Sequence, residues 1–287
     1  MEQPRSHRYD NLDGSFLNAY GFTYGFIEAI KENRKVVHLV FWILDNSASM
    51  RALDGNRLSI DVGNIRFLKC TRWEELKDTA LFHIDLAAWI GAPTTVRLLN
   101  HPGHNEQIFS VAKTPEAPRL EHDVSNARIT LQRVYPNGST PLTEHIQAII
   151  RTIEPMNDTL RATGKKVAVV IATDGIPTNV YGEETKLEKE LFLQQVKELK
   201  RLEVMLVVRL CTNEKIVVDF WNKSDAVVEA MQDVIDDFES EAKEVHAKNP
   251  WLTYGLPLHR LREMGFLNKV VDELDEIALP LSKCGAS

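Results

Sequence analysis

The sequence predicts an α/β fold in which a doubly wound, mostly parallel central sheet carries helices on both faces. Short runs of β-branched residues alternate with longer segments of helical period, which is typical of repeated strand–helix units. Three runs are apolar almost throughout, as expected for strands that are buried on both faces: 36–44, 167–172 and 204–210. With 287 residues, of which 44% are hydrophobic, the chain can bury a sizeable core without disulfides or a structural metal.

The first part of the predicted core contains three strands and one helix. The apolar strand over 36–44 is followed by an intervening segment, 50–71, and then by a helix over 72–90, whose apolar residues recur at three- and four-residue steps. Two shorter strands are predicted over 95–99 and 107–112, with prolines and a glycine marking the turns around them. The insertion 50–71 contains an Asp-Gly-Asn turn signal and would lie beside the end of the first strand, as a gate or as a simple surface excursion.

The clearest helical pattern lies over 142–156. Thr140 is predicted to cap this helix, and Pro141 to occupy its first position, where a missing backbone N–H costs nothing. The two later apolar strands enclose one further helix, over 187–202.

The pattern is weaker toward the C-terminus. Residues 227–235 fit either a last strand or the start of a helix, 237–248 fit a helix, and a short helix is expected near 258–264. The acidic residues between 233 and 241 are interpreted as a solvated helix face.

Three regions are therefore expected along the chain. An N-terminal segment, 1–33, packs on the core; the principal domain covers 34–236, with the 50–71 insertion beside the candidate site; and a helical C-terminal extension covers 237–287. The extension contains enough large apolar residues that we expect it to pack on the core as well.

Composition excludes some functions and favours one compartment. The formal net charge is −7, which gives nucleic-acid binding no support. The N-terminus lacks the apolar stretch of a signal peptide, and no apolar run approaches the roughly 20 residues of a membrane helix, so we expect a cytoplasmic protein without membrane insertion. The three cysteines form no C-x-x-C pair, which fits a reducing compartment and disfavours a zinc site.

Five oxygen-bearing side chains follow predicted strands or precede a predicted helix. Asp45, Ser47 and Ser49 come directly after the first strand, Thr140 precedes the helix over 142–156, and Asp174 follows the strand over 167–172. Because the carboxyl ends of parallel strands converge where the strand order reverses, these side chains are expected to meet in one crevice.

These five residues offer hard oxygen donors without nitrogen or sulfur. Such a set suits Mg²⁺ best, with Ca²⁺ or Mn²⁺ as alternatives. Two carboxylates at most neutralise a divalent ion, so the ion would still accept an anionic oxygen from outside, such as a Glu or Asp of a partner protein. The sequence therefore predicts a metal-bridged protein-binding site that needs neither a catalytic residue nor an organic cofactor.

The ordered set Asp45-x-Ser47-x-Ser49, then Thr140, then Asp174-Gly175 resembles the metal-ion-dependent adhesion site of the von Willebrand factor A (vWA) domain. The resemblance covers about 34–236, is closest to intracellular members of unassigned role, and implies a Rossmann-like sheet with a partner-binding metal site at its edge. The sequence departs from the family in two places: Ala48 stands where the family usually has Gly, and the 50–71 insertion separates the serines from the first helix.

Two other interpretations remain at this point. In the first, the five oxygens serve only as helix caps and in turn hydrogen bonds, although this leaves two aspartates at two strand ends unexplained. The functional alternative is a Mg-dependent hydrolase or phosphatase with Asp45 in the active site. That chemistry normally has a second Asp two residues later, where this chain has Ser47, and the phosphate-binding and nucleophile-elbow glycine motifs are absent.

Overall fold

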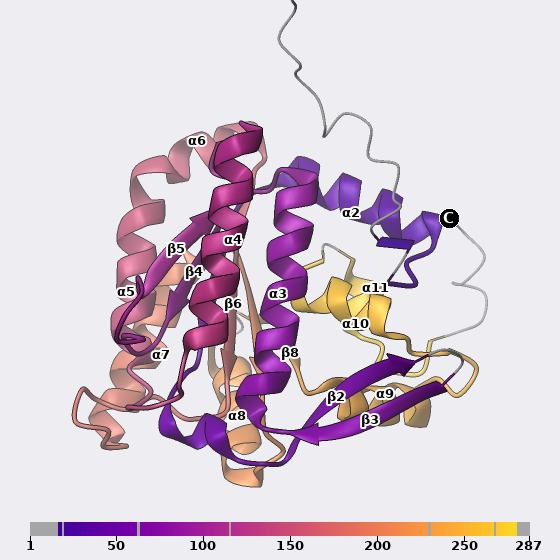
Figure 1. The fold of residues 1–287 in the computed structure, drawn as a ribbon. Helices are drawn as coiled ribbons and strands as arrows, with labels where there is room; N and C mark the ends of the chain where they lie inside the picture. The colour runs from indigo at the N-terminus through magenta and orange to yellow at the C-terminus, as the bar shows by residue number, and fades with distance from the viewer. Residues whose placement is uncertain are drawn as a thin grey trace, which may run out of the picture.

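The computed structural model describes residues 17–18, 20–61, 64–114, 116–228, 231–266 and 268–279. At its centre is a six-stranded sheet in the order β5-β4-β1-β6-β7-β8, in which every neighbouring pair is parallel except β4 and β5. Helices flank this sheet (Figure 1), so the predicted α/β class with a mostly parallel central sheet is confirmed. The six strands are β1 (Val37–Leu44), β4 (Thr94–Leu98), β5 (Ile108–Val111), β6 (Lys166–Thr173), β7 (Val204–Leu210) and β8 (Met231–Ile235).

The central strands separate two apolar layers. Trp42 of β1 belongs to a layer that includes α3 and α4, whereas its neighbour Ile43 belongs to a layer that includes α5, α7 and α8. Successive side chains of a strand point to opposite faces, and here both faces are covered, which explains why these strands are apolar throughout. The helices are α2 (Tyr24–Val36), α3 (Arg72–Ile90), α4 (Ala117–Arg133), α5 (Leu142–Ile153), α6 (Asn157–Thr163), α7 (Lys186–Lys200), α8 (Lys215–Val228), α9 (Phe238–Lys248), α10 (Leu256–Glu263) and α11 (Lys269–Asp272), with 3₁₀ turns at η1 (Ala48–Arg51) and η2 (Glu154–Met156).

The insertion after β1 forms an antiparallel hairpin of β2 (Gly55–Asp61) and β3 (Asn64–Cys70). Its base is tight, because a Cβ atom at Gly55 would lie 2.7 Å from the carbonyl oxygen of Thr71. Thr71 then caps α3 in a reciprocal pair with Glu74, which fixes where the helix begins. In Figure 1 the hairpin runs along the bottom of the molecule toward α9, and Phe67 and Phe238 lie with ring centroids 6.2 Å apart.

The C-terminal part resolves the ambiguous region. Residues 227–235 contain the end of α8 and the strand β8, so the last-strand interpretation holds for most of them. The helix predicted over 237–248 is confirmed as α9, and its cap is Asp237, whose carboxylate accepts the backbone N–H groups of Glu239 and Ser240. The first 16 residues of the predicted N-terminal segment and the last eight of the extension lie outside the described residues.

Several helices were not predicted, namely α2, α4, α6 and most of α8. The start of α5 also differs: it begins at Leu142, Pro141 precedes it, and no side chain caps it, so the prediction of Thr140 as a cap is wrong. Among the described residues, no helix is both long enough and apolar enough to cross a membrane.

Candidate metal site

The candidate site lies where the order of strands in the sheet reverses. The chain passes from β1 to β4 and β5 on one side, then to β6, β7 and β8 on the other. Leu44 and Ala172 are paired at the ends of β1 and β6, and the N–H of Asp45 donates to the carbonyl oxygen of Ala172 at 2.9 Å. Asp45 and Asp174 therefore follow adjacent parallel strands, at the edge where such sheets form their binding crevices.

A chain of hydrogen bonds joins these two aspartates through the serines of η1. The N–H of Ser47 donates to Asp45 Oδ1 at 2.8 Å, the hydroxyl oxygens of Ser47 and Ser49 lie 3.0 Å apart, and Ser49 Oγ donates to Asp174 Oδ1 at 2.8 Å. The tight turn of η1 brings Ser49 back over the strand end. Four of the five predicted residues thus form one connected group.

Ala48 fits this turn without glycine's conformational freedom. Ala112 is the one non-glycine residue with a positive φ in the described part of the chain, so Ala48 adopts an ordinary conformation. The N–H of Ala48 donates to the carbonyl oxygen of Gly138 at 3.2 Å, which ties the serine turn to the loop that carries Thr140.

Thr140 approaches the group from the loop before α5. Its main chain exchanges hydrogen bonds with Thr178, at 2.9 Å to the Thr178 hydroxyl and 3.0 Å from the Thr178 N–H. Its hydroxyl faces Gly175, because a Cβ atom at that glycine would lie 3.2 Å from Thr140 Oγ1. Thr140 is therefore buried beside Asp174-Gly175, although no hydrogen bond joins its hydroxyl to either aspartate in the described part of the structure.

The sequence interpretation missed Arg72. Its Nη1 donates to Asp174 Oδ2 at 2.8 Å, its Nε and Nη2 make a bidentate pair with Asp54 at 2.7 and 2.6 Å, and Nη2 also reaches Glu214 at 2.7 Å. Arg72 is the first residue of α3, so the only local signal was its position after the cap Thr71. Nothing in the sequence indicates that the hairpin turns this side chain toward the crevice.

The site carries more negative charge than Arg72 balances. Burial raises the pKa of Asp45 to about 6, and the nearby charge of Asp174 adds to this rise. Burial also raises the pKa of Asp174, although its hydrogen bond from Arg72 opposes this. Arg72 contacts Asp174 but not Asp45, whose oxygens accept only uncharged donors, from Ser47 and Thr173.

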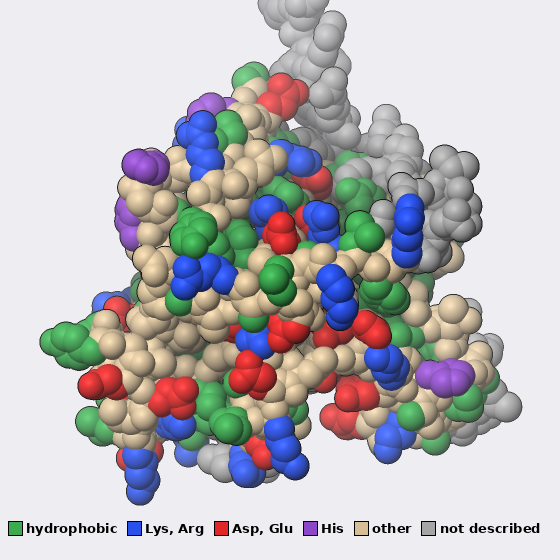
Figure 2. All heavy atoms as spheres, turned by 60° about the horizontal axis from the view of Figure 1, so that its bottom comes forward, with side chains coloured by type: hydrophobic (Ala, Val, Ile, Leu, Met, Phe, Trp, Pro, Cys, Tyr) green, Lys and Arg blue, Asp and Glu red, His purple; other side chains and the backbone are tan. Residues whose placement is uncertain are grey.

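This donor set fits a divalent cation. The carboxylates and hydroxyls of Asp45, Ser47, Ser49 and Asp174 are hard oxygen ligands within one hydrogen-bonded group, and the excess negative charge favours a cation beside them. Ser49 is exposed while the other three are buried, so the group opens to solvent on the serine side. Figure 2, which brings this edge of the molecule forward, shows a face where acidic and basic side chains lie close together.

The interpretation of the acidic run as a solvated face is wrong for three of its members. Asp237 and Glu241 are buried, the side chain of Asp233 is 7% exposed, and Asp233 and Glu241 both contact Arg262 of α10. The run spans β8 and the first turn of α9, so its side chains do not share one helix face. Cys70 and Cys211, by contrast, are buried free thiols, as expected from their spacing.

No protein-family model and no curated protein matches this chain. Solved structures similar to it include the PilB minor pilin from Streptococcus sanguinis in a mutant form (TM-score 0.45, 13% identity) and in its unsubstituted form (TM-score 0.42, 13% identity). Each match covers 70% of this chain and 57% of the pilin chain. The TFIIH p34 N-terminal domain is similar at a TM-score of 0.42 and 8% identity, over 71% of this chain and 92% of that one. These values are too low to assign a family or a function.

Proposed function

We propose that this chain is a divalent-cation-dependent protein-binding domain of the vWA type, with Asp45, Ser47, Ser49, Thr140 and Asp174 as its metal ligands. The observation that carries the proposal is the hydrogen-bonded chain from Asp45 through the two serines to Asp174, across the ends of β1 and β6. A set of caps and turn hydrogen bonds would not require two buried aspartates at adjacent strand ends.

The chemistry of the partner follows from the charge of the site. A cation bound by two carboxylates and neutral hydroxyls supplies an electrophilic centre that accepts one further anionic oxygen. We infer that the partner offers an acidic side chain at the exposed serine side. The five proposed ligands would orient the cation, while Arg72 donates a hydrogen bond to Oδ2 of Asp174.

The structure favours binding over hydrolysis for Asp45. Its side chain is fully buried, and its two oxygens accept hydrogen bonds from the Ser47 N–H and the Thr173 hydroxyl. Nucleophilic attack needs direct contact between a carboxylate oxygen and the substrate, whereas a carboxylate ligand can also act on a cation through a bound water. The Mg-dependent phosphatase therefore has less support than the binding domain.

The decisive experiment is a calorimetric titration of Mg²⁺, Ca²⁺ and Mn²⁺ into chelator-treated protein, with Asp45→Ala and Asp174→Ala beside the wild type. We expect one saturable site that both substitutions abolish, while Asp158→Asn, an exposed carboxylate of α6, leaves it unchanged. Circular dichroism would establish that each variant is folded. If both folded variants bind the cation as the wild type does, the proposed ligands are wrong.

Two further measurements separate binder from enzyme. Partner capture from an extract should require the cation, and chelator should release the captured protein. A generic phosphate ester incubated with Mg²⁺ should not turn over; turnover that disappears in Asp45→Asn would favour the phosphatase instead.

A further inference from the structure

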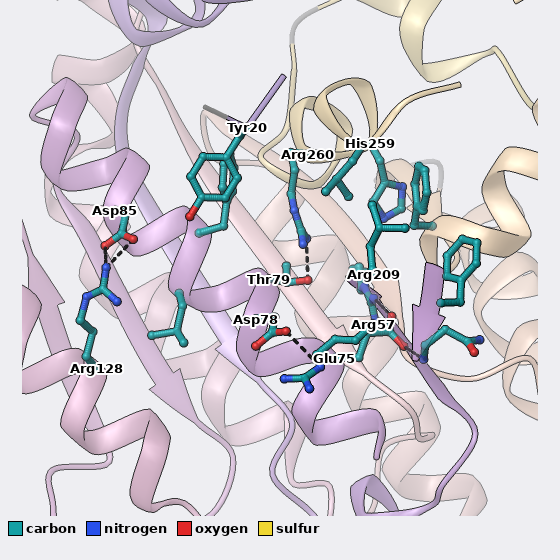
Figure 3. A pocket seen from close by; sticks show the side chains of 17 residues that line it. Tyr20, Arg57, Glu75, Asp78, Thr79, Asp85, Arg128, Arg209, His259 and Arg260 are labelled. Carbon is teal, nitrogen blue, oxygen red and sulfur yellow. Dashed lines mark hydrogen bonds and ion pairs between the residues drawn. The ribbon is translucent and has the colours of Figure 1, made fainter. Parts of the chain in front are cut away.

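A second cavity lies on the outer side of α3, away from the five proposed metal ligands. It has a volume of about 450 Å³ and is bordered by the β2–β3 hairpin, α3, α4, α9 and α10 (Figure 3). This volume is in the range of pockets that enclose small molecules, roughly 300–1,000 Å³. None of Asp45, Ser47, Ser49, Thr140 and Asp174 lines it.

Aromatic and aliphatic side chains form much of the cavity wall. Phe82 comes from α3, Phe67 from the hairpin and Phe238 from α9, with Leu58 and Leu256 between them. Phe67 remains 45% exposed, so a large apolar ring borders the cavity without being fully covered. Such a wall suits the apolar body of a ligand.

Three guanidinium groups from three different elements reach this cavity with unused donors. Within the described part of the chain, Arg57 of β2 is held only by a 3.5 Å contact between its Nε and Asp78, with both side chains 40% exposed. Nη1 of Arg260, in α10, donates hydrogen bonds to Thr79 and Glu263. Its Nε and Nη2 have no hydrogen-bond partner among the described residues. Arg209 of β7 is almost fully buried, and its Nε lacks a hydrogen-bond partner there but lies 3.6 Å from Glu263 Oε1.

Arg57 and Arg260 converge on adjacent positions of α3. Figure 3 shows Arg260 reaching down to Thr79 and Arg57 beside Asp78, so both guanidinium groups border the same part of the cavity. The Arg57–Asp78 contact is long and half exposed, which makes it weak and easily exchanged for a better acceptor.

The charges around the cavity are balanced. Four arginines line the cavity, Arg57, Arg128, Arg209 and Arg260, against three carboxylates, Glu75, Asp78 and Asp85. Glu263, which is not part of the lining, contacts Arg209 and Arg260 and supplies the fourth carboxylate. An anion is therefore favoured by the unused N–H donors of Arg57 and Arg260, because guanidinium groups match carboxylate and phosphate oxygens in a fork geometry.

We propose that this cavity binds a small amphipathic anion, with its acidic head group between Arg57 and Arg260 and its apolar body against Phe67 and Phe82. The volume of the cavity fits a small molecule. The unused guanidinium donors would bind the head group, and the aromatic wall beside them would contact the apolar body. This site contains none of the five proposed metal ligands.

The test uses a set of naphthalene probes that differ only in their head group: naphthoate, naphthyl phosphate and neutral naphthalenemethanol. Each is titrated by calorimetry into the whole protein in the presence of EDTA, which removes the cation site from the measurement. We expect one saturable site for the anions and at least about tenfold weaker binding of the neutral probe, since a charge-assisted hydrogen bond is lost. The stronger of the two anions identifies the head group as carboxylate or phosphate.

Two variants at exposed positions separate the two halves of the site. Arg57→Gln should weaken the anions about tenfold and leave naphthalenemethanol unchanged, whereas Phe67→Ala should weaken all three probes. Arg201→Gln, a 74% exposed arginine of the α7–β7 turn, is the matched control and should bind like the wild type. The proposal is overturned if no anion binds saturably at millimolar concentration, if the neutral probe binds as well as the anions, or if Arg57→Gln binds like Arg201→Gln.

Discussion

Arg72 and Arg262 each contact three carboxylates, but in very different surroundings. Arg72 contacts Asp174, which is buried, together with Asp54 and Glu214, whose side chains are 55% and 62% exposed. Arg262 contacts Asp233, Glu241 and Asp275, whose side chains are at most 12% exposed. The same charge composition thus appears once at an open edge of the sheet and once inside the C-terminal packing.

The difference shows what enclosure does to an ion cluster. Around Arg262, water cannot replace a lost partner, so every charge depends on the others. Around Arg72, two of the three carboxylates are exposed to water. Water can therefore replace the guanidinium at either exposed carboxylate at little cost in free energy. The Arg262 cluster therefore holds α10 to β8 and α9, whereas the Arg72 cluster would be able to rearrange around the proposed cation.

The largest expected effect is at Arg262. Arg262→Met removes the only guanidinium that faces three enclosed carboxylates, and we expect the free energy of unfolding to fall by about 3–5 kcal/mol. Urea unfolding followed by circular dichroism measures this loss. Arg161→Met, at an exposed pair with Glu203, is the control and should change stability by less than about 1 kcal/mol. A loss at Arg262 no larger than at Arg161 would contradict the structural role of the cluster.

The next effect is a pH dependence with a defined sign. Burial raises the pKa of Asp233 to about 7 and that of Glu241 to about 8, although Arg262 opposes both shifts. In the unfolded chain these carboxyls are ionised above about pH 5, so the folded state binds more protons from there up to the raised pKa values. Stability should therefore fall as pH rises from 5 to 8.

Urea unfolding at four pH values between 5 and 8 tests this slope, and Asp233→Asn should flatten it. The Arg72 cluster provides the contrast. The hydrogen bonds from Arg72 lower the pKa of Asp54, so its contribution is present above the usual carboxyl range and is lost only on acidification. If stability instead rises from pH 5 to pH 8, the pKa values of Asp233 and Glu241 are not raised in the folded protein.

A smaller effect is expected at Arg72, and it concerns the cation more than the fold. Arg72→Gln removes a positive charge next to Asp174, so the proposed cation site should bind Mg²⁺ more tightly, by roughly three- to tenfold. Stability should also fall, by about 2–3 kcal/mol, because Asp174 stays buried without its guanidinium partner but keeps its hydrogen bond from Ser49. Arg51→Gln, an exposed arginine of η1 that contacts Tyr135, is the control in the same calorimetric titration. Weaker cation binding in Arg72→Gln would show that this guanidinium supports the site instead of competing with the cation.

The smallest effect is expected at Glu214. Glu214→Gln leaves Arg72 with Asp54 and Asp174, and the Glu214 side chain is 62% exposed, so the change in unfolding free energy should stay below about 1 kcal/mol. Thermal melts of this variant beside Arg262→Met give the direct comparison of an open and an enclosed cluster. A loss above about 2 kcal/mol would mean that exposure does not separate them.

Prediction from sequence succeeded where burial leaves a strong pattern. The strands β1, β6 and β7 are apolar on both faces, and α3 and α5 carry regular stripes, so the sheet and its crevice were predicted. Helix α4 was missed because its sequence is polar and only a few apolar residues form its buried face, such as Leu120, Ala127 and Leu131.

The candidate site shows the same limit. Asp45, Ser47, Ser49 and Asp174 follow predicted strands, so local reasoning could bring them together. Arg72 reaches the site only because the hairpin fixes the start of α3, and Asp233 meets Arg262 only because α10 packs on β8. Contacts between distant segments produce no periodic pattern in the local sequence. These charged partners could therefore not be predicted from the sequence.

The first turn of α3 carries Arg72 to the candidate metal site, and one turn later it carries Glu75 to the cavity, where Glu75 contacts Arg209. A ligand that shifts this helical turn would move Arg72 relative to Asp174 and so alter the affinity of the proposed cation site. Thermodynamic reciprocity then requires the cation to alter the affinity of the cavity ligand by the same factor. One helix turn would thus couple the proposed anion on one side of α3 to the proposed cation at its end.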